Sequence, residues 1–191
     1  FLFRSLIKNT YAEVQNSEDG DTKVVYHSNL WLWGFGLAFH WAFLIIVIRH
    51  MRFFTNPVPF FINWFEYFDG IAQIGVPVWY ITDFLLLAGV TFLFARRLYS
   101  GHLRYISLPG DYFPLFLILS IATTGVLMRY VAPFRVNIEA VKELSMGIVG
   151  FSFALPDAPI GYMFFVHFLL VCTLMIYFPF SKLMHMAGVF F

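Results

Sequence analysis

This sequence predicts an all-α integral membrane protein, an antiparallel bundle of transmembrane helices, on three observations. Hydrophobic residues fill 60% of the 191 positions and charged residues only 12%, with a mean hydropathy of +0.76, far from an ordinary soluble domain. Four apolar stretches are close to the roughly 20 residues that a helix needs to cross a bilayer. Each stretch is continuous, whereas a membrane barrel would alternate over segments of about ten residues, so we expect these segments to be helices rather than strands.

The N-terminal part is expected to contain the end of one helix and a polar connector. The apolar triplet at 1–3 precedes Arg4 and Lys8, the reverse of the order in a signal peptide. We interpret it as the end of a first helix, which would make four full helices here and five in the intact protein. Residues 4–29 are polar and acidic, and we expect a water-exposed loop or docking surface on the cytoplasmic side.

Hydropathy divides the rest of this single domain, residues 1–191, into membrane and interface segments. Between residues 58 and 74, aromatic residues recur at helical spacing with polar residues between them, which is typical of a helix lying in the membrane interface. In chain order we expect a transmembrane helix at 30–50, the interfacial helix at 58–74, transmembrane helices at 76–97 and 111–131, an outer loop at 132–158 and a last transmembrane helix at 159–187.

Lysine and arginine positions predict the orientation in the cell's inner (cytoplasmic) membrane, because cytoplasmic loops are enriched in them. One side would hold seven basic residues: Arg4, Lys8, Lys23, Arg96, Arg97, Arg104 and Lys182. The other would hold five: Arg49, Arg52, Arg129, Arg135 and Lys142. Seven against five favours the first side as cytoplasmic.

Composition also narrows the function. A net charge of +1 without a basic cluster gives no indication of a nucleic-acid partner. Cys172 is the only cysteine, so the chain has neither an internal disulfide nor a cysteine-held iron–sulfur cluster, and it has no motif for covalent haem attachment. A redox cofactor would therefore be held by histidine or belong to another subunit.

Four histidines lie inside two of the apolar segments, where polar ring nitrogens are costly and mark relays, ligand sites or cavities. His40 and His50 are ten residues apart, about 15 Å along a helix, and His167 and His185 are eighteen apart, about 27 Å. Since two helices lie between these segments, the segments run antiparallel. His40 then faces His185 at the inner level and His50 faces His167 at the outer level.

Three interpretations of these histidines stay open on the residues alone. Imidazole is a common axial ligand of haem iron, and bundle interiors hold such cofactors between facing helices. Histidines in a membrane can instead relay protons in a haem-free transporter or channel subunit. A zinc-binding scaffold is the third reading, although no carboxylate or thiol accompanies the histidines in either segment.

Both histidine-bearing segments resemble the nitrate reductase gamma-subunit family of di-haem b-type cytochromes. LAFHWAFLIIVIRH is similar to that family's first histidine-bearing helix, and VHFLLVCTLMIYFPFSKLMHM to its closing helix. The two histidine spacings and a basic FARRL run also fit, and the likeness extends from about Trp31 to Val189. Within the family, HSNLWLWGFGLAFHW and FPFSKLMHM look closest to membrane cytochromes of dissimilatory sulfite reductase-linked electron-transfer complexes.

The resemblance implies two haems b, with His40 and His185 as axial ligands of the inner haem and His50 and His167 as those of the outer haem. It also implies electron exchange with a membrane quinone or menaquinol near the outer haem. The electrons would pass to a cytoplasmic iron–sulfur subunit resembling the catalytic subunit of heterodisulfide reductase. The basic residue that nitrate reductase gamma subunits have after the outer haem's helix has no counterpart, because Gly70 lies near that position.

Other polar residues are candidates for secondary roles. Arg49, Arg52 and Lys182 could bind haem propionates, although arginines snorkelling to the membrane surface and positive-inside anchoring explain them equally well. Glu66, Tyr67 and Asp69 are quinone-site candidates, since a quinol needs proton acceptors, but they also suit the polar face of an interfacial helix. The arginines at 96, 97 and 104 form a surface where a soluble redox partner could dock.

We therefore expect a quinol-oxidising subunit that anchors a multi-subunit oxidoreductase, exchanges electrons with the menaquinone pool and relays them across the membrane, in dissimilatory sulfur metabolism. The catalytic chemistry would lie in partner subunits, so no catalytic residue is assigned in this chain. Heterodisulfide reductase and nitrate reductase membrane subunits are the alternatives within the family.

Overall fold

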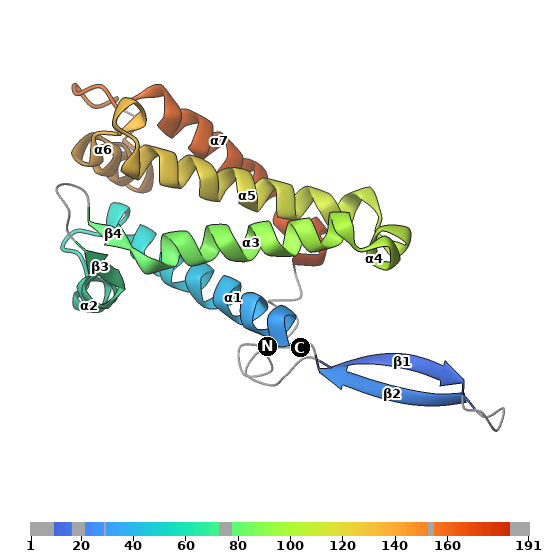
Figure 1. Ribbon diagram of the computed structural model, residues 1–191. Coiled ribbons are helices and arrows are strands. Elements are labelled where there is room, and N and C mark those ends of the chain that lie inside the picture. The colour runs from blue at the N-terminus through green and yellow to red at the C-terminus, as the bar shows by residue number, and fades with distance from the viewer. Residues whose placement is uncertain (1–9, 17–21, 29, 73–77, 153–154, 184–191) are drawn as a thin grey trace.

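The computed structural model (Figure 1) describes residues 10–16, 22–28, 30–72, 78–152 and 155–183. Its described part consists mainly of helices, as expected for an all-α membrane protein. The long helices are α1 (Leu30–His50), α3 (Ile81–Tyr99), α5 (Pro109–Tyr130) and α7 (Tyr162–Tyr177). Shorter helices are α2 (Phe60–Asp69), α4 (Gly101–Ile106) and α6 (Ile138–Val149), with 3-10 turns η2 (Met51–Phe53), η3 (Ala132–Phe134) and η4 (Phe178–Phe180).

The long helices pack side by side in chain order, α1 on α3, α3 on α5 and α5 on α7 (Figure 1). The chain reverses between each of them and the next, so α1 and α7 run antiparallel. α2 and α6 lie at one end of the bundle and α4 at the other (Figure 1). We call these the α2 end and the α4 end.

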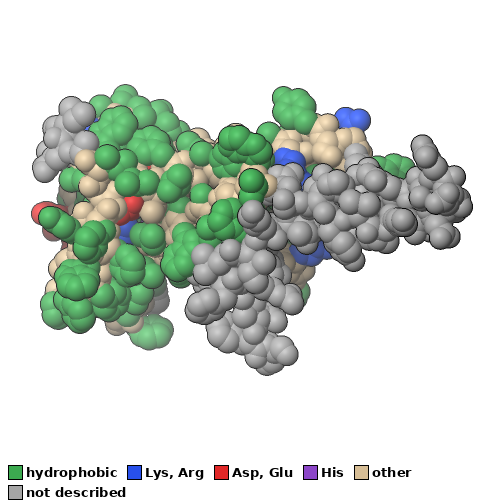
Figure 2. Space-filling model, turned by 60° about the horizontal axis from the view of Figure 1, so that its bottom comes forward, with side chains coloured by type: hydrophobic (Ala, Val, Ile, Leu, Met, Phe, Trp, Pro, Cys, Tyr) green, Lys and Arg blue, Asp and Glu red, His purple; other side chains and the backbone are tan. Residues whose placement is uncertain are grey.

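By length and composition, three of the described helical segments could cross a membrane: Leu30–Phe53, Pro109–Tyr130 and Tyr162–Phe180. α3 packs between α1 and α5 but includes Asp83, Arg96 and Arg97, which makes it more polar. Hydrophobic side chains cover much of the surface shown in Figure 2. On α7, for example, Leu169 is 67% exposed and Ile176 73% exposed, as suits a helix surrounded by lipid.

A small apolar core joins the first three long helices. Ala42, Leu86 and Ala122 are buried together, one from each of α1, α3 and α5. Gly89 lets α1 and α3 approach closely, since a Cβ at this position would lie 3.1 Å from Cβ of Phe39. Small residues at such contacts allow backbones in membranes to pack closely.

The connector at 4–29, expected to be a water-exposed loop or docking surface, contains two strands. Strands β1 (Thr10–Asn16) and β2 (Thr22–Ser28) pair antiparallel as a hairpin, with Thr10 opposite Ser28. Such a hairpin is compatible with a membrane protein outside the hydrocarbon, where water satisfies its open edges. A second pair, β3 (Gly70–Ala72) and β4 (Trp79–Tyr80), joins α2 to the start of α3.

Helix boundaries differ from the prediction where local chemistry interrupts the hydropathy pattern. The interfacial helix predicted at 58–74 is α2, which ends at Asp69 because the chain continues as strand β3. The helix predicted from residue 76 begins at Ile81, after β4. α5 occupies 109–130 rather than 111–131, and the predicted loop at 132–158 contains α6.

The last helix is shorter than the predicted 159–187. Gly161 has a φ of +97°, a conformation that cannot continue into a right-handed helix, so α7 begins at Tyr162. Pro179 lacks a backbone N–H, and the chain passes from α7 into the short turn η4. Residues 184–187, with His185, lie outside the described residues.

Candidate functional site

Three of the four membrane histidines lie in the described residues, and each has a hydrogen bond at Nδ1. On α1, Nδ1 of His40 is 2.6 Å from the carbonyl oxygen of Gly36, and Nδ1 of His50 is 2.7 Å from that of Ile46. A carbonyl only accepts, so Nδ1 carries the hydrogen in both rings. The lone pair of each imidazole is then on Nε2, the arrangement of a metal-ligating histidine oriented by its second nitrogen.

His167, on α7, is oriented by a residue of the neighbouring helix. Its Nδ1 is 2.8 Å from the hydroxyl of Thr124 on α5. That hydroxyl lies 2.9 Å from the carbonyl oxygen of Ser120 and 3.0 Å from that of Ile121, to which it donates its hydrogen. The Thr124 oxygen therefore accepts from Nδ1 of His167, whose lone pair is also on Nε2.

His50 and His167 belong to the same region of the bundle. His50 is the last residue of α1 and His167 lies near the start of α7, and these two helices, the first and last of the row, run antiparallel. Gly125 presents no side chain to the His167 ring, and a Cβ there would lie 3.5 Å from Cε1. Two imidazoles on antiparallel helices, each with a lone pair on Nε2, fit the donor set of a haem iron.

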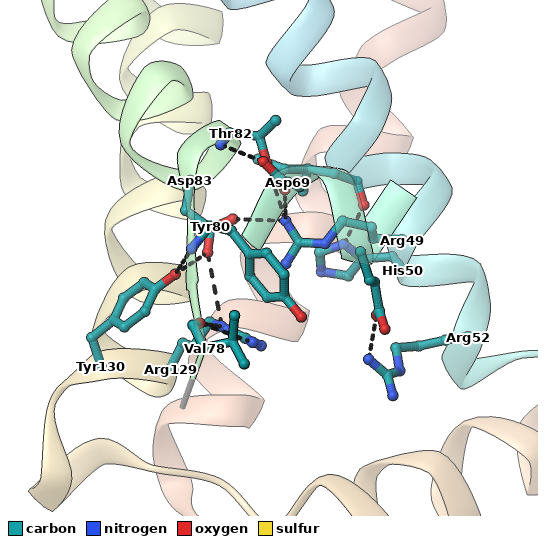
Figure 3. A network of polar contacts seen from close by, with 12 residues as sticks. Arg49, His50, Arg52, Asp69, Val78, Tyr80, Thr82, Asp83, Arg129 and Tyr130 are labelled. Carbon is teal, nitrogen blue, oxygen red and sulfur yellow. Dashed lines mark hydrogen bonds and ion pairs between the residues drawn. The ribbon is translucent and has the colours of Figure 1, made fainter. Parts of the chain in front are cut away.

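A polar cluster lies beside His50 at the α2 end (Figure 3). We define it as Arg49, Asp69, Tyr80, Thr82, Asp83, Arg129 and Tyr130. Its four charges, two arginines and two aspartates, sum to zero. Charged side chains in a low-dielectric region need partners of opposite charge, because an unpaired buried charge is strongly destabilising.

Arg49 is the centre of the cluster and is 91% buried. Its guanidinium lies 2.6 Å from Asp69, 3.3 Å from Asp83 and 3.1 Å from the Thr82 hydroxyl. It also stacks over the Tyr80 ring at 3.5 Å. Together these contacts tie α1 to α2 and α3.

The two aspartates of the cluster differ in how tightly they are bound. Asp69 accepts from the Thr82 backbone N–H at 2.9 Å and from the Thr82 hydroxyl at 2.5 Å, in addition to Arg49. Asp83 has longer ion pairs, 3.3 Å to Arg49 and 4.0 Å to Arg129, and its short contact is the 2.7 Å bond from the Tyr130 hydroxyl. Both aspartates therefore have partners on both oxygens, but Asp69 has short contacts on each, whereas the one short contact of Asp83 comes from a phenol.

The propionate candidates already have carboxylate partners. Arg49 binds the two aspartates, yet its Nε is buried and has no hydrogen-bond partner in the described part of the chain. Arg52 forms an ion pair with Glu66. Lys182 lies 2.7 Å from Asp111 at the α4 end, where Arg97 is 3.8 Å from the same carboxylate. Of the three, Arg49 retains a buried donor that suits a further carboxylate.

The quinone-site candidates are separated by the structure into different environments. Glu66 is the partner of Arg52, and Asp69 is buried under Arg49 with 6% exposure. Tyr67 is 81% exposed on α2. These three residues are close in sequence but differ in partners and in exposure.

Several residues of the site were not among the sequence candidates. Asp83 could have been found, because a carboxylate inside a membrane segment is a functional signal. Thr124, Tyr130 and Arg129 lie on α5, whose sequence gives no indication of their partners on α7 and α3. Across the described ranges no group of three or more His, Cys, Asp or Glu side chains is arranged to hold a metal ion.

Comparisons with known proteins give one family match and two similar relatives. The family model described as nitrate reductase gamma subunit matches residues 6–191. A protein of Archaeoglobus profundus named Hdr-like menaquinol oxidoreductase cytochrome b-like subunit is 40% identical over 195 residues, covering 100% of this chain and 55% of the relative. A protein of Archaeoglobus fulgidus with the same name is 39% identical over 194 residues, covering 100% and 56%. The chain thus spans about half the length of these relatives.

Proposed function

This chain belongs to the nitrate reductase gamma subunit family, and on that premise we propose that it is the membrane cytochrome b subunit of a menaquinol-oxidising complex. It holds two haems b, with His50 of α1 and His167 of α7 as the ligands of one, and His40 and His185 as those of the other. The haem irons, when bound, supply one-electron transfer between the two membrane surfaces. The relatives' name, menaquinol oxidoreductase cytochrome b-like subunit, supports the substrate and the cofactor.

One observation carries the haem proposal. Each described histidine of the two helices has its Nδ1 hydrogen bound to an internal acceptor, so that Nε2 has the lone pair. A histidine that relays protons needs both nitrogens to exchange hydrogen, whereas an axial ligand needs one oriented lone pair. The hydrogen bonds therefore favour ligation over a proton relay.

The remaining candidates take supporting roles in this proposal. Arg49, through its buried Nε, binds a propionate on the His50 side. Arg52 and Lys182 would share their present carboxylate partners with a propionate. Glu66, Tyr67 and Asp69 lie on the α2 end, where menaquinol would be oxidised on the outer side of the inner membrane.

The electrons leave at the α4 end to a cytoplasmic iron–sulfur subunit resembling the catalytic subunit of heterodisulfide reductase. The Hdr-like label of the relatives' name supports this choice of partner over a nitrate reductase. The process served would be dissimilatory sulfur metabolism. The chain's own contribution is positional, because it keeps quinol protons at one surface while electrons cross to the other.

An optical redox spectrum of the purified full-length subunit tests the haem proposal. We expect a b-type signal at two haems per chain. Replacing His50 or His167 should delete the same haem, and replacing His40 or His185 the other. A colourless preparation would contradict the haem proposal and favour the proton-relay or zinc interpretation. If the His40 and His167 variants lost the same haem, the proposed pairing of the histidines would be wrong.

A further inference from the structure

A half-exposed aromatic cluster lies beside the polar cluster at the α2 end. Trp79, Phe84 and Tyr130 bring their rings together from β4, α3 and α5. The Trp79 and Phe84 rings are 5.5 Å apart at 16°, and the Phe84 and Tyr130 rings are 5.6 Å apart at 28°. Trp79 is 42% exposed and Phe84 38% exposed, so part of each side chain is open to the surroundings of the bundle.

The Tyr130 hydroxyl connects this aromatic cluster to a carboxylate. It donates to Asp83 at 2.7 Å and accepts from the backbone N–H of Tyr80 at 3.0 Å. A phenol oxygen has two acceptor positions, and one of them is used by Tyr80. The second can accept a hydrogen bond from a ligand hydroxyl.

Asp83 is the carboxylate of the polar cluster that can take up a proton. Asp69 is bound on both oxygens by Arg49 and Thr82, so protonating it would break short contacts. The ion pairs of Asp83 are longer, at 3.3 Å to Arg49 and 4.0 Å to Arg129, and its side chain is 13% exposed. These two arginines, Asp69, Tyr130 and the more distant His50 are the charged and titratable groups that act on it.

We propose that the aromatic cluster binds the ring of the quinol and that Tyr130 and Asp83 together accept one of its protons. The inference rests on the proposed function and assigns it a site that the sequence candidates Glu66, Tyr67 and Asp69 did not include. Stacking suits a planar aromatic ligand. A carboxylate reached through a phenol suits a ligand that must lose a proton when it is oxidised.

The proton step balances as follows. One quinol O–H bond breaks and its proton moves to the Tyr130 oxygen, while the Tyr130 proton moves to Asp83 and leaves a neutral carboxylic acid. The proton of the second quinol hydroxyl goes to water at the membrane surface. The haem b of the proposed function would supply the one-electron oxidant for the two electrons, and the quinol becomes the quinone.

Direct binding of a hydroxyquinoline N-oxide, a fluorescent menaquinol analogue, to the haem-loaded complex tests the site without relying on turnover. Tyr130→Phe keeps the ring and removes the hydroxyl, so the affinity should fall about tenfold. Tyr162→Phe is the matched control, because Tyr162 is a 64% exposed phenol at the same end, in edge contact with Phe134. Its affinity should equal that of the wild type.

A second variant addresses proton acceptance. Asp83→Asn should slow menaquinol oxidation about a hundredfold with the haem spectrum retained, because the amide cannot take the proton. Asp111→Asn is its control, since Asp111 has a similar exposure, 9%, and two basic partners at the α4 end. If Asp83→Asn does not assemble, the Tyr130→Phe result still decides.

Failure of the site and failure of the function give different results. If the wild-type complex holds haem and binds the analogue, and the Tyr130→Phe complex binds it with unchanged affinity, only the proposed site is overturned. A wild type without haem, or without analogue binding, would overturn the proposed function and the site with it.

Discussion

At the residue scale, the three described histidines are oriented in two different ways. His40 and His50 donate to carbonyls one turn earlier in their own helix, so α1 alone determines their tautomers. His167 depends instead on Thr124, a side chain of α5. The Thr124 hydroxyl donates its hydrogen to its own helix, so only its oxygen lone pair is available to the imidazole. A residue of α5 therefore determines the tautomer of His167.

Thr124→Val should therefore weaken haem binding at His167. Valine has the shape of threonine but lacks the oxygen that accepts from Nδ1, and losing such an orienting contact costs about tenfold or more in metal affinity. Haem titration of the reconstituted subunit would measure this change. Thr123→Val is the control, because the Thr123 hydroxyl bonds only to the Leu119 carbonyl of its own helix; equal effects of both variants would contradict the prediction.

At the element scale, the close contact between α1 and α3 aligns the two sides of the polar cluster. Gly89 is buried against Phe39, and the contact brings the end of α1, with Arg49, next to the start of α3, with Asp83. α2 joins the same point through Asp69. The arrangement of these helices thus depends on one small residue in the middle of α3 and on ion pairs at its end.

Gly89→Ala should destabilise the bundle although alanine favours helices. The added Cβ would meet Phe39 Cβ at 3.1 Å and Phe39 Cα at 3.3 Å, and we expect a loss of about 1 kcal/mol in the free energy of unfolding. Gly34→Ala, with no atom within 4 Å of its added Cβ, should instead be neutral or gain up to about 1 kcal/mol. Denaturant titration in detergent, followed by helical circular dichroism, would measure both. The same sign for the two variants would contradict the close-contact argument.

At the scale of the whole molecule, the two ends of the bundle differ in how their charges are used. The α2 end contains the neutral polar cluster, with its arginines buried or bound to carboxylates. At the α4 end, Arg97 and Lys182 bind Asp111, while Arg104 is exposed on α4 and its side chain forms no polar contact with the described residues. Exposed Tyr99 and Tyr105 lie beside it, at 88% and 92%. This combination of charge and aromatic surface suits the docking of a subunit.

Arg104→Glu should reduce copurification of the iron–sulfur subunit proposed to dock at the α4 end, because charge reversal in an interface introduces repulsion. We expect a reduction of at least about tenfold in the retained partner. Arg135→Glu is the matched control, an exposed arginine at the opposite end. Quantifying the partner after affinity purification at two salt concentrations measures the effect, and undiminished copurification of the Arg104→Glu variant would count against docking there.

Much of the helical architecture could be predicted from hydropathy because membrane helices need long apolar runs. The first predicted span, 30–50, agrees with α1. The predictions failed where hydropathy carries no information: the connector forms the hairpin β1–β2, and α7 begins at Tyr162 because Gly161 has a positive φ. Strand pairing and backbone dihedrals depend on local partners that an average over apolar residues does not detect.

The sequence by itself determined the membrane class, the long apolar helices and the spacing of the four histidines, since all three depend only on the order of residues along one chain. Only the tertiary structure decided which side chains act together. Thr124 meets His167 across 43 positions, and Tyr130 meets Asp83 across 47. These contacts form because α5 packs between α3 and α7, and helix packing depends on the shapes of facing surfaces that no single segment contains.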